Sequence, residues 1–181
     1  MDSANSACKL TVTNSMRLIA LAFIALLGPL VSDAQDPSTT RAINRTLDAL
    51  HNAASKADGP RYFAQFTNDA IYIGTDASER WTLAQFREFA EPYFKRGTGW
   101  TYKPRHRNIV VPNIPCHCIA WFDELLDSES YGTSRGTGVL RLTDGVWKVA
   151  QYALTFPVPN DLAKGMTDEI KTFEAKKKRE R

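Results

Sequence analysis

The dipeptide Asp144-Gly145 constrains this chain more than any other feature, because it lies between two runs of strand-forming residues. An Asp-Gly pair in that position is a strong signal for a two-residue β-hairpin turn. Pairing outward from the turn predicts these opposed residues: Leu142 and Trp147, Leu140 and Val149, Gly138 and Gln151, Gly136 and Ala153. These pairs are expected to share one face of the sheet, and the alternate residues, including Tyr152 and Leu154, the other.

Strand-forming stretches follow one another through the second half of the chain, whereas helical periodicity dominates the first half. The predicted strands of the second half cover residues 100–111, 116–126, 133–142 and 146–156. In the first half, one helix is predicted from a start within 37–40, capped by Ser or Thr, to residue 56. Two more helices are predicted over 61–66 and 83–96, and one strand over 70–75. Thr82 is the predicted cap of the third helix, whose apolar face comprises Leu83, Phe86, Phe89, Ala90 and Tyr93. This order predicts an α+β fold with helices packed on one face of a curved, mainly antiparallel sheet.

The first 34 residues have the pattern of a secretory signal peptide. Arg17 precedes ten uncharged, mostly apolar residues (18–27), and small residues at Ser32 and Ala34 predict cleavage after Ala34. The apolar run is shorter than the ~20 residues of a membrane span. A buried helix or an uncleaved anchor is the alternative, and either Met1 or Met16 can be the start. We therefore expect an exported protein, periplasmic or secreted, without a stable membrane span after cleavage.

The net positive charge of the chain is confined to its C-terminus. The whole sequence has 23 Lys and Arg against 20 Asp and Glu, but residues 35–170 have 15 basic and 16 acidic residues. Six basic residues lie in 171–181, which is typical of a solvated terminus. The predicted organisation is a signal peptide (1–34), a folded domain (35–162) and a basic tail (163–181). Because the domain has no basic stripe interleaved with aromatic residues, nucleic-acid binding is not expected.

Several stretches in a fixed order resemble the SnoaL-like branch of the nuclear-transport-factor-2-like (NTF2-like) superfamily. The stretches are FTNDAIYIGTD (66–76), ERWT (79–82), GTGWTY (97–102), WFDE (121–124), YGTSRG (131–136), GVWKVAQY (145–152) and TFP (155–157). The resemblance covers about residues 40–162 and implies a cone of helices over a strongly bent sheet, with a pocket inside and often a dimer. Members include isomerases, dehydratases, cyclases and pure binding or assembly domains, so the fold does not decide the function.

The predicted pocket lies on the sheet face that contains Gly136 and Gly138. Two successive glycines on one face leave room for a ligand or a packed helix, or they only allow the sheet to bend. Both interpretations remain open from the sequence. The expected polar groups of this face are Ser134, Gln151 and Thr155, and its apolar walls are Leu140, Val149 and Trp147.

The adjacent carboxylates Asp123 and Glu124 point to opposite faces of a strand. The family resemblance favours Trp121 and Asp123 as the inward pair. A carboxylate in an apolar cavity has a raised pKa and can act as a general base, with Tyr72 and Tyr102 as hydrogen-bond donors. The alternative is a structural ion pair of Asp123 with Arg135 or Arg105.

Two further groups of polar residues have a ligand-binding and a structural interpretation each. Asp76, Glu79, Arg80 and Trp81 precede the third helix at the expected mouth of the cone. They either bind a polar ligand there or fix the helix entrance by ion pairs, with Trp81 as a core residue. The row Lys103, Arg105 and Arg107 either attracts an anion or forms the solvated face of a strand.

Cys116-His117-Cys118 has ligand-type side chains at a spacing that is poor for a metal, since His117 points away from the two cysteines. A disulfide between the cysteines would close a very small, strained ring, and one of them could pair between chains. The favoured interpretation is two small apolar residues at a hairpin. No metal site is predicted.

No phosphate loop, dinucleotide fingerprint or nucleophilic triad is present in the sequence, so no cofactor is expected. The leading hypothesis is an exported domain that binds a small organic ligand in a partly apolar pocket. One alternative is a cofactor-independent isomerase or lyase that uses Asp123 as its base. Another is an assembly domain, a homodimer formed through the outer sheet face around Tyr152 and Leu154.

Overall fold

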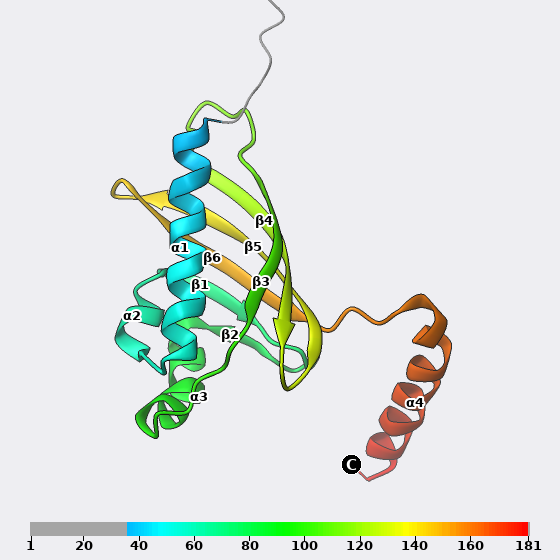
Figure 1. The fold of residues 1–181 in the computed structure, drawn as a ribbon. Coiled ribbons are helices and arrows are strands. Elements are labelled where there is room, and N and C mark those ends of the chain that lie inside the picture. Colours follow the sequence, from blue (N-terminus) through cyan, green and yellow to red (C-terminus); the bar gives the residue numbers. More distant parts are fainter. Residues whose placement is uncertain (1–35, 181) are drawn as a thin grey trace, which may run out of the picture. The chain divides into compact units, whose positions relative to one another are not determined.

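The computed structural model describes residues 36–180, so the predicted signal peptide lies outside the described residues. The helices are α1 (Pro37–Ser55), α2 (Gly59–Phe63), α3 (Leu83–Lys95) and α4 (Asn160–Arg179). The strands are β1 (Phe66–Ile73), β2 (Arg80–Thr82), β3 (Lys103–Val110), β4 (Ile119–Ser128), β5 (Gly132–Thr143) and β6 (Val146–Thr155). All strands join one sheet in the order β2-β1-β6-β5-β4-β3 (Figure 1).

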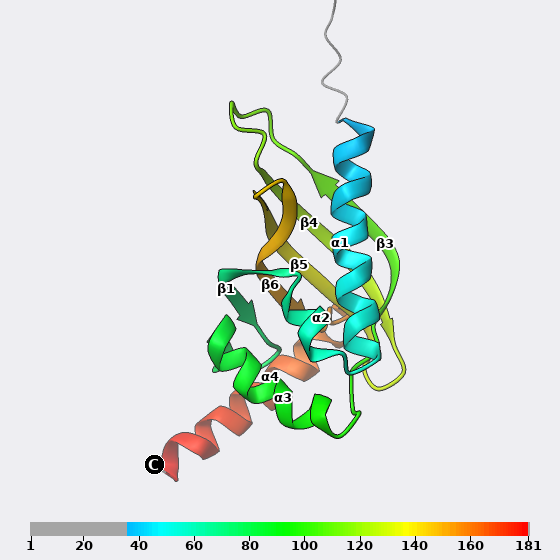
Figure 2. The same ribbon diagram turned by 90° about the vertical axis from the view of Figure 1, so that its left-hand side faces the viewer.

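The predicted α+β architecture is confirmed. Strands β3 to β6 form the expected antiparallel meander, and β1 extends it by pairing in parallel with β6. Helix α1 crosses one face of the curved sheet, and α2 and α3 lie toward the end of α1 that contains Ser55 (Figures 1 and 2). The three-residue strand β2 was not predicted, because Arg80–Thr82 is too short to show a strand pattern.

Helix α1 begins where its capping residues require. The side chain of Asp36 accepts a hydrogen bond from the Ser38 backbone N–H, and Pro37 occupies the first turn, where its missing N–H costs nothing. The start therefore lies within the predicted range 37–40, but the cap is Asp36 and not the predicted Ser or Thr. The buried residues Ile43, Leu47, Leu50 and Ala54 recur at helical spacing and bind the helix to the core.

Helix α3 confirms the predicted cap, since Thr82 and Gln85 form a reciprocal capping box. Its buried face differs from the prediction. Phe94 is buried, whereas Phe89 and Tyr93 are 44% and 40% exposed. The two exposed rings instead form an aromatic row along the helix, with ring centroids 5.5 Å apart.

The hairpin register is confirmed near the turn and wrong beyond it. Leu142 pairs with Trp147 and Leu140 with Val149, as predicted, but a β-bulge follows between Leu140 and Val139. The bulge leaves one extra residue on β6, so Gly138 pairs with Tyr152 and Gly136 with Leu154. A shift of one residue exchanges the two faces of a strand.

The exchange of faces overturns two predictions. Tyr152 and Leu154 are buried inside the cone, so they cannot form the predicted dimer surface. Gln151 and Thr155 are exposed, so they do not line the inner face. Ser134 and the walls Leu140, Val149 and Trp147 are buried as expected.

Gly136 and Gly138 make room for neighbouring side chains, not for a ligand. A Cβ atom at Gly136 would collide with the Tyr152 hydroxyl and lie 2.9 Å from Oε1 of Glu124. At Gly138 it would collide with the carbonyl oxygen of Gln151 and lie 2.8 Å from the Phe122 ring. Gly136 therefore permits the close packing of a β4 and a β6 side chain across β5, and Gly138 permits the approach of the Phe122 ring and the β6 backbone.

Helix α4 begins three residues before the predicted basic tail (163–181) and includes most of it. None of its residues is buried, and Leu162, Met166, Ile170 and Phe173 are exposed along it. Within residues 36–180, no helix has the length and apolar character needed to cross a membrane.

Candidate functional site

Glu124, the inward carboxylate of β4, is completely buried. The inner face of β4 contains Ala120, Phe122, Glu124 and Leu126, and its outer face contains Trp121 and Asp123. The predicted inward orientation of Asp123 and Trp121 is therefore wrong. The reason is the register with β5, because Phe122 and Glu124 lie opposite Gly138 and Gly136 and fill the space that these glycines leave.

The outer residues have their own contacts. Trp121 is 46% exposed, and Asp123 accepts a hydrogen bond of 3.0 Å from the side-chain amide of Asn108. Arg105, one of the predicted partners of Asp123, pairs instead with Asp127 at 3.1 Å. Asp123 is thus an exposed residue of the outer sheet face and does not lie in the apolar cavity that its predicted role as a base requires.

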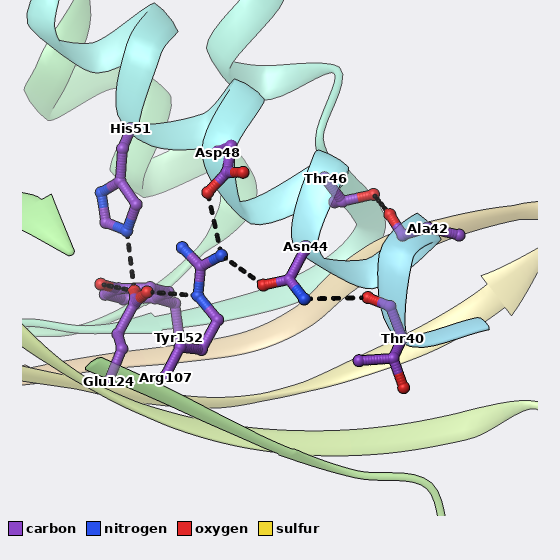
Figure 3. A network of polar contacts seen from close by, with 9 residues as sticks. All are labelled: Thr40, Ala42, Asn44, Thr46, Asp48, His51, Arg107, Glu124 and Tyr152. Carbon is purple, nitrogen blue, oxygen red and sulfur yellow. Dashed lines mark hydrogen bonds and ion pairs between the residues drawn. The ribbon is translucent and has the colours of Figure 1, made fainter. Parts of the chain in front are cut away.

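Three side chains compensate the charge of Glu124 (Figure 3). His51 Nε2 lies 2.7 Å from Oε1, and the Tyr152 hydroxyl donates to the same oxygen at 3.1 Å. Arg107 Nε donates to Oε2 at 2.8 Å. A buried carboxylate is tolerated when it is paired and hydrogen-bonded in this way.

Arg107 extends the network to the polar side of α1. Its Nη1 donates to Asp48 Oδ1 at 2.9 Å and to Asn44 Oδ1 at 2.8 Å (Figure 3). Only 8% of the Arg107 side chain is exposed, whereas Lys103 and Arg105 are exposed. Of the predicted basic row, Arg107 alone binds an inner anion, and that anion is Glu124.

Sequence reasoning missed His51 and Glu124, although a signal for them was present. Asn44, Asp48 and His51 recur at positions i, i+4 and i+7 of α1, so they form one polar stripe beside the buried apolar residues. Such a stripe on a helix that packs against a sheet indicates a buried polar network. The identity of its partners depends on which carboxylate of β4 faces inward.

The pKa values of the network follow from its geometry. Burial by itself would raise the pKa of the Glu124 carboxyl, but the hydrogen bond and charge of His51, together with Arg107, outweigh this effect, and the pKa is lowered. For Tyr152, burial and the neighbouring Glu124 charge both raise the pKa well above its ordinary value. Glu124 is therefore ionised, and Tyr152 is protonated, at neutral pH.

A small cavity of about 10 Å³ lies next to His51. It is lined by Leu50, His51, Ala54, Tyr62, Tyr72, Trp100, Tyr102, Tyr152 and Leu154. This volume accommodates about one water molecule. The partly exposed members of the lining are His51, Trp100 and Tyr102, which form its side toward solvent.

The cavity brings together the two tyrosines predicted as donors. Burial raises the pKa of both Tyr72 and Tyr102, so both hydroxyls remain protonated donors at neutral pH. His51 contributes a different group. Its Nε2 is engaged by Glu124, whereas its Nδ1 has no hydrogen-bond partner within residues 36–180.

The remaining predicted site residues lie elsewhere. In the loop between β1 and β2, the Asp76 backbone N–H donates to Glu79 Oε2 at 3.2 Å, and Asp76 accepts from Ser78. Arg80 is exposed, and Trp81 stacks on Phe89 with ring centroids 4.9 Å apart. These contacts fix the loop that leads into β2 and α3.

Ser134, Cys116 and Cys118 are the last of the residues that the sequence analysis singled out. The Ser134 hydroxyl is buried and has no hydrogen-bond partner among the described residues. Cys116 and Cys118 form a disulfide, so their interpretation as two unlinked apolar residues is wrong. In the described part of the chain, no three His, Cys, Asp or Glu side chains are grouped in a way that could hold a metal ion.

We expect the substitution Glu124→Gln to lower the free energy of unfolding by about 3 kcal/mol at pH 7, because it breaks a buried ion pair. Since its pKa is lowered in the folded state, ionised Glu124 stabilises the fold above its ordinary pKa, and this stabilisation is lost as the pH falls below about 4. The variant should therefore lose part of the acid sensitivity of the wild type in urea unfolding.

Asp123→Asn is the matched control, because Asp123 is adjacent on the same strand but exposed. We expect it to change the stability by less than about 0.5 kcal/mol. Equal losses in the two variants would contradict the assignment of Glu124 as the buried charge.

Comparisons with known proteins agree with this fold. The profile of the SnoaL-like domain matches residues 43–159. The comparison with curated proteins gives no match. The structure is similar to an NTF2-like protein of unknown function from Pseudomonas putida KT2440, with a TM-score of 0.58 and 15% identity over 69% of this chain and 91% of that chain.

Two further similar structures have names that refer to a reaction. A candidate dehydratase of the NTF2-like family from Streptomyces avermitilis has a TM-score of 0.57 and 10% identity, over 68% of this chain and 100% of that chain. A ketosteroid isomerase-like protein from Erwinia carotovora atroseptica has a TM-score of 0.51 and 18% identity, over 68% and 100%. At these identities the likeness shows the fold alone, whereas the profile match spans more than half of the chain. This chain therefore belongs to the SnoaL-like domain family of the NTF2-like superfamily.

Proposed function

We propose that this domain binds a small, partly aromatic molecule next to His51 and that His51 transfers a proton to or from it. The observation that carries the proposal is the 2.7 Å contact between His51 Nε2 and the buried Glu124, beside a cavity that tyrosines line. We also propose that the domain is exported. The signal-peptide pattern supports export, as does the Cys116–Cys118 disulfide, because disulfides persist in oxidising compartments.

His51 is better suited than a carboxylate to act as the base. Glu124 is ionised but bound to Arg107, and its lowered pKa makes it a poor proton acceptor. Glu124 can instead accept a hydrogen bond from the Nε2–H of His51, which leaves Nδ1 with a free lone pair. A carboxylate at one ring nitrogen also stabilises the imidazolium that forms when the other accepts a proton. Glu124 is thus a positioning residue for His51.

The tyrosines suit a ligand that has an oxygen atom on a ring. Aromatic walls contact the ring, and the Tyr72 and Tyr102 hydroxyls can donate to an oxygen on which negative charge develops. The cavity accommodates only about one water, so a larger ligand requires Trp100 and Tyr102 to move outward. Isomerisation and dehydration both need such proton transfer, which fits the names of two similar structures.

The test is deuterium exchange at the carbon next to a ketone carbonyl, with cyclohexanone and 1-indanone as probes in D₂O. We expect the wild type to accelerate the exchange and His51→Gln to reduce this acceleration about 100-fold, because the acceptor nitrogen is lost. Mass spectrometry of the recovered ketone measures the incorporated deuterium, and a thermal-shift series with the same ketones measures binding.

His106→Gln is the control, since His106 is exposed on β3 and its ring forms a hydrogen bond of 3.0 Å with the exposed Asn108, away from the cavity. Its exchange rate should equal that of the wild type. If the wild type and His51→Gln exchange both ketones at the same rate, and neither ketone shifts the melting temperature, the proposal is wrong.

A second candidate function is assembly, and the exposed apolar residues of the outer sheet face favour it. Trp121 pairs with Val110 on β3 and with Val139 on β5, and both Trp121 and Val110 are at least 40% exposed. The almost filled cone agrees with a domain that assembles without a ligand. A second copy placed on this face would bury the three apolar side chains.

Sedimentation equilibrium at micromolar concentration tests this candidate. We expect a dimer for the wild type and a monomer for Trp121→Arg, because an arginine at the centre of the interface would be buried without a partner. Val146→Arg, which changes an exposed residue next to the hairpin turn, should leave the dimer intact. A monomeric wild type, or a dimer that both substitutions leave intact, would rule out this interface.

A further inference from the structure

The disulfide between Cys116 and Cys118 lies in the exposed loop that leads into β4. A single residue, His117, separates the two cysteines, whose Cα atoms are 5.0 Å apart. Cys116 and His117 are exposed, whereas Cys118 is half-buried. The Cys118 carbonyl accepts a hydrogen bond of 2.8 Å from the Leu142 N–H, so the sheet holds Cys118 in place.

The bond contributes little to the stability of the fold. The entropy that a disulfide removes from the unfolded chain grows with the loop it closes, and this loop is as short as three residues including the cysteines. The loop already has its own hydrogen bonds, from Ile114 N–H to Pro112 O at 2.9 Å and from His117 N–H to Ile114 O at 3.0 Å. The position of β4 therefore does not depend on the disulfide.

The backbone at His117 is strained in the disulfide form. Its φ of +44° lies in the left-handed region, which costs free energy for a residue with a Cβ atom. When the bond opens, the chain between the cysteines can relax to ordinary dihedral angles. Strained and exposed disulfides are more easily reduced than buried structural ones.

We propose that the Cys116–Cys118 disulfide is a thiol–disulfide exchange site that oxidises accessible pairs of cysteine thiols in peptides. The bond is reactive because it is exposed, closes a short loop and strains the backbone at His117. Because the sheet holds the half-buried Cys118 in place, Cys116 is the sulfur that is open to attack. This inference does not depend on the proposed proton transfer at His51.

The exchange proceeds in two balanced steps. A peptide thiolate attacks Cys116 Sγ, the Cys116–Cys118 bond breaks, and Cys118 leaves as a thiolate with the electron pair and takes up a proton from solvent. The second peptide thiolate then attacks the peptide sulfur of the mixed disulfide, and Cys116 leaves as a thiolate. The peptide gains a disulfide, the protein is reduced to a dithiol, and glutathione disulfide can re-form the bond by the reverse exchange.

The first experiment traps the mixed disulfide. The full chain is prepared as Cys118→Ser and as Cys116→Ser, and each is reacted with glutathione disulfide. Peptide mass spectrometry follows the adduct at the named cysteine and distinguishes it from one at Cys8. We expect the adduct at Cys116 in Cys118→Ser to form at least ten times faster than the adduct at Cys118 in Cys116→Ser, because Cys118 is half-buried. Equal rates would overturn the assignment of Cys116 as the attacked sulfur.

The second experiment measures the equilibrium of the bond with glutathione. The wild type is equilibrated in buffers of defined glutathione ratio, the free thiols are alkylated, and the reduced fraction is measured by mass. His117→Gly should shift the equilibrium about five-fold toward the disulfide, since glycine adopts a positive φ without strain. It leaves both cysteines in place, so the comparison does not depend on a variant that lacks the bond.

A third measurement tests the activity itself. A peptide with two cysteines is incubated with stoichiometric wild-type protein, and one peptide disulfide should form for each protein disulfide lost. Two outcomes would show that the disulfide is only structural. Either the bond stays oxidised in excess reduced glutathione, or the Cys116→Ser protein oxidises the peptide as fast as the wild type does.

Discussion

The negative charge of Glu124 inside the cone is the constraint on which the rest of the structure depends. An uncompensated carboxylate in an apolar interior costs several kcal/mol, so its partners must be supplied by the elements around it. His51 comes from α1, Arg107 from β3 and Tyr152 from β6, and each contacts one of the carboxylate oxygens. Gly136 provides the space in which these groups meet.

This compensation connects the fold to its chemistry. Arg107 binds Glu124 and also Asp48, so one guanidinium joins the sheet to α1. The same carboxylate orients the imidazole of His51, which leaves one ring nitrogen free beside the aromatic cavity. The two oxygens of Glu124 therefore have different roles. The oxygen that Arg107 binds stabilises the fold, and the oxygen that His51 contacts orients the reactive imidazole. The disulfide at Cys116 lies apart from this network and has a separate chemistry.

The sequence was sufficient to predict most of the helices and strands. It was insufficient to predict which strand residues point into the cone. Turn chemistry and capping gave the hairpin at Asp144-Gly145 and the start of α3 at Thr82, because these signals act within a few residues. The inward residue of the pair Asp123-Glu124 is set by pairing with β5, which is a long-range contact. Likewise, the bulge between Leu140 and Val139 has no local signal, and it reverses the faces of Gln151 and every later residue of β6. Of the residues that line the cavity, the sequence therefore predicted only Tyr72 and Tyr102.

The most direct test of the central claim is the tautomer of His51, measured from the ¹⁵N chemical shifts of its ring at neutral pH in wild-type protein and in Glu124→Gln. If Glu124 holds the imidazole, the wild type should show a protonated Nε2 and an unprotonated Nδ1 in the neutral ring, and this preference should weaken in the variant. A proton on Nδ1 in the neutral ring of the wild type, or the same tautomer ratio in both proteins, would contradict the account.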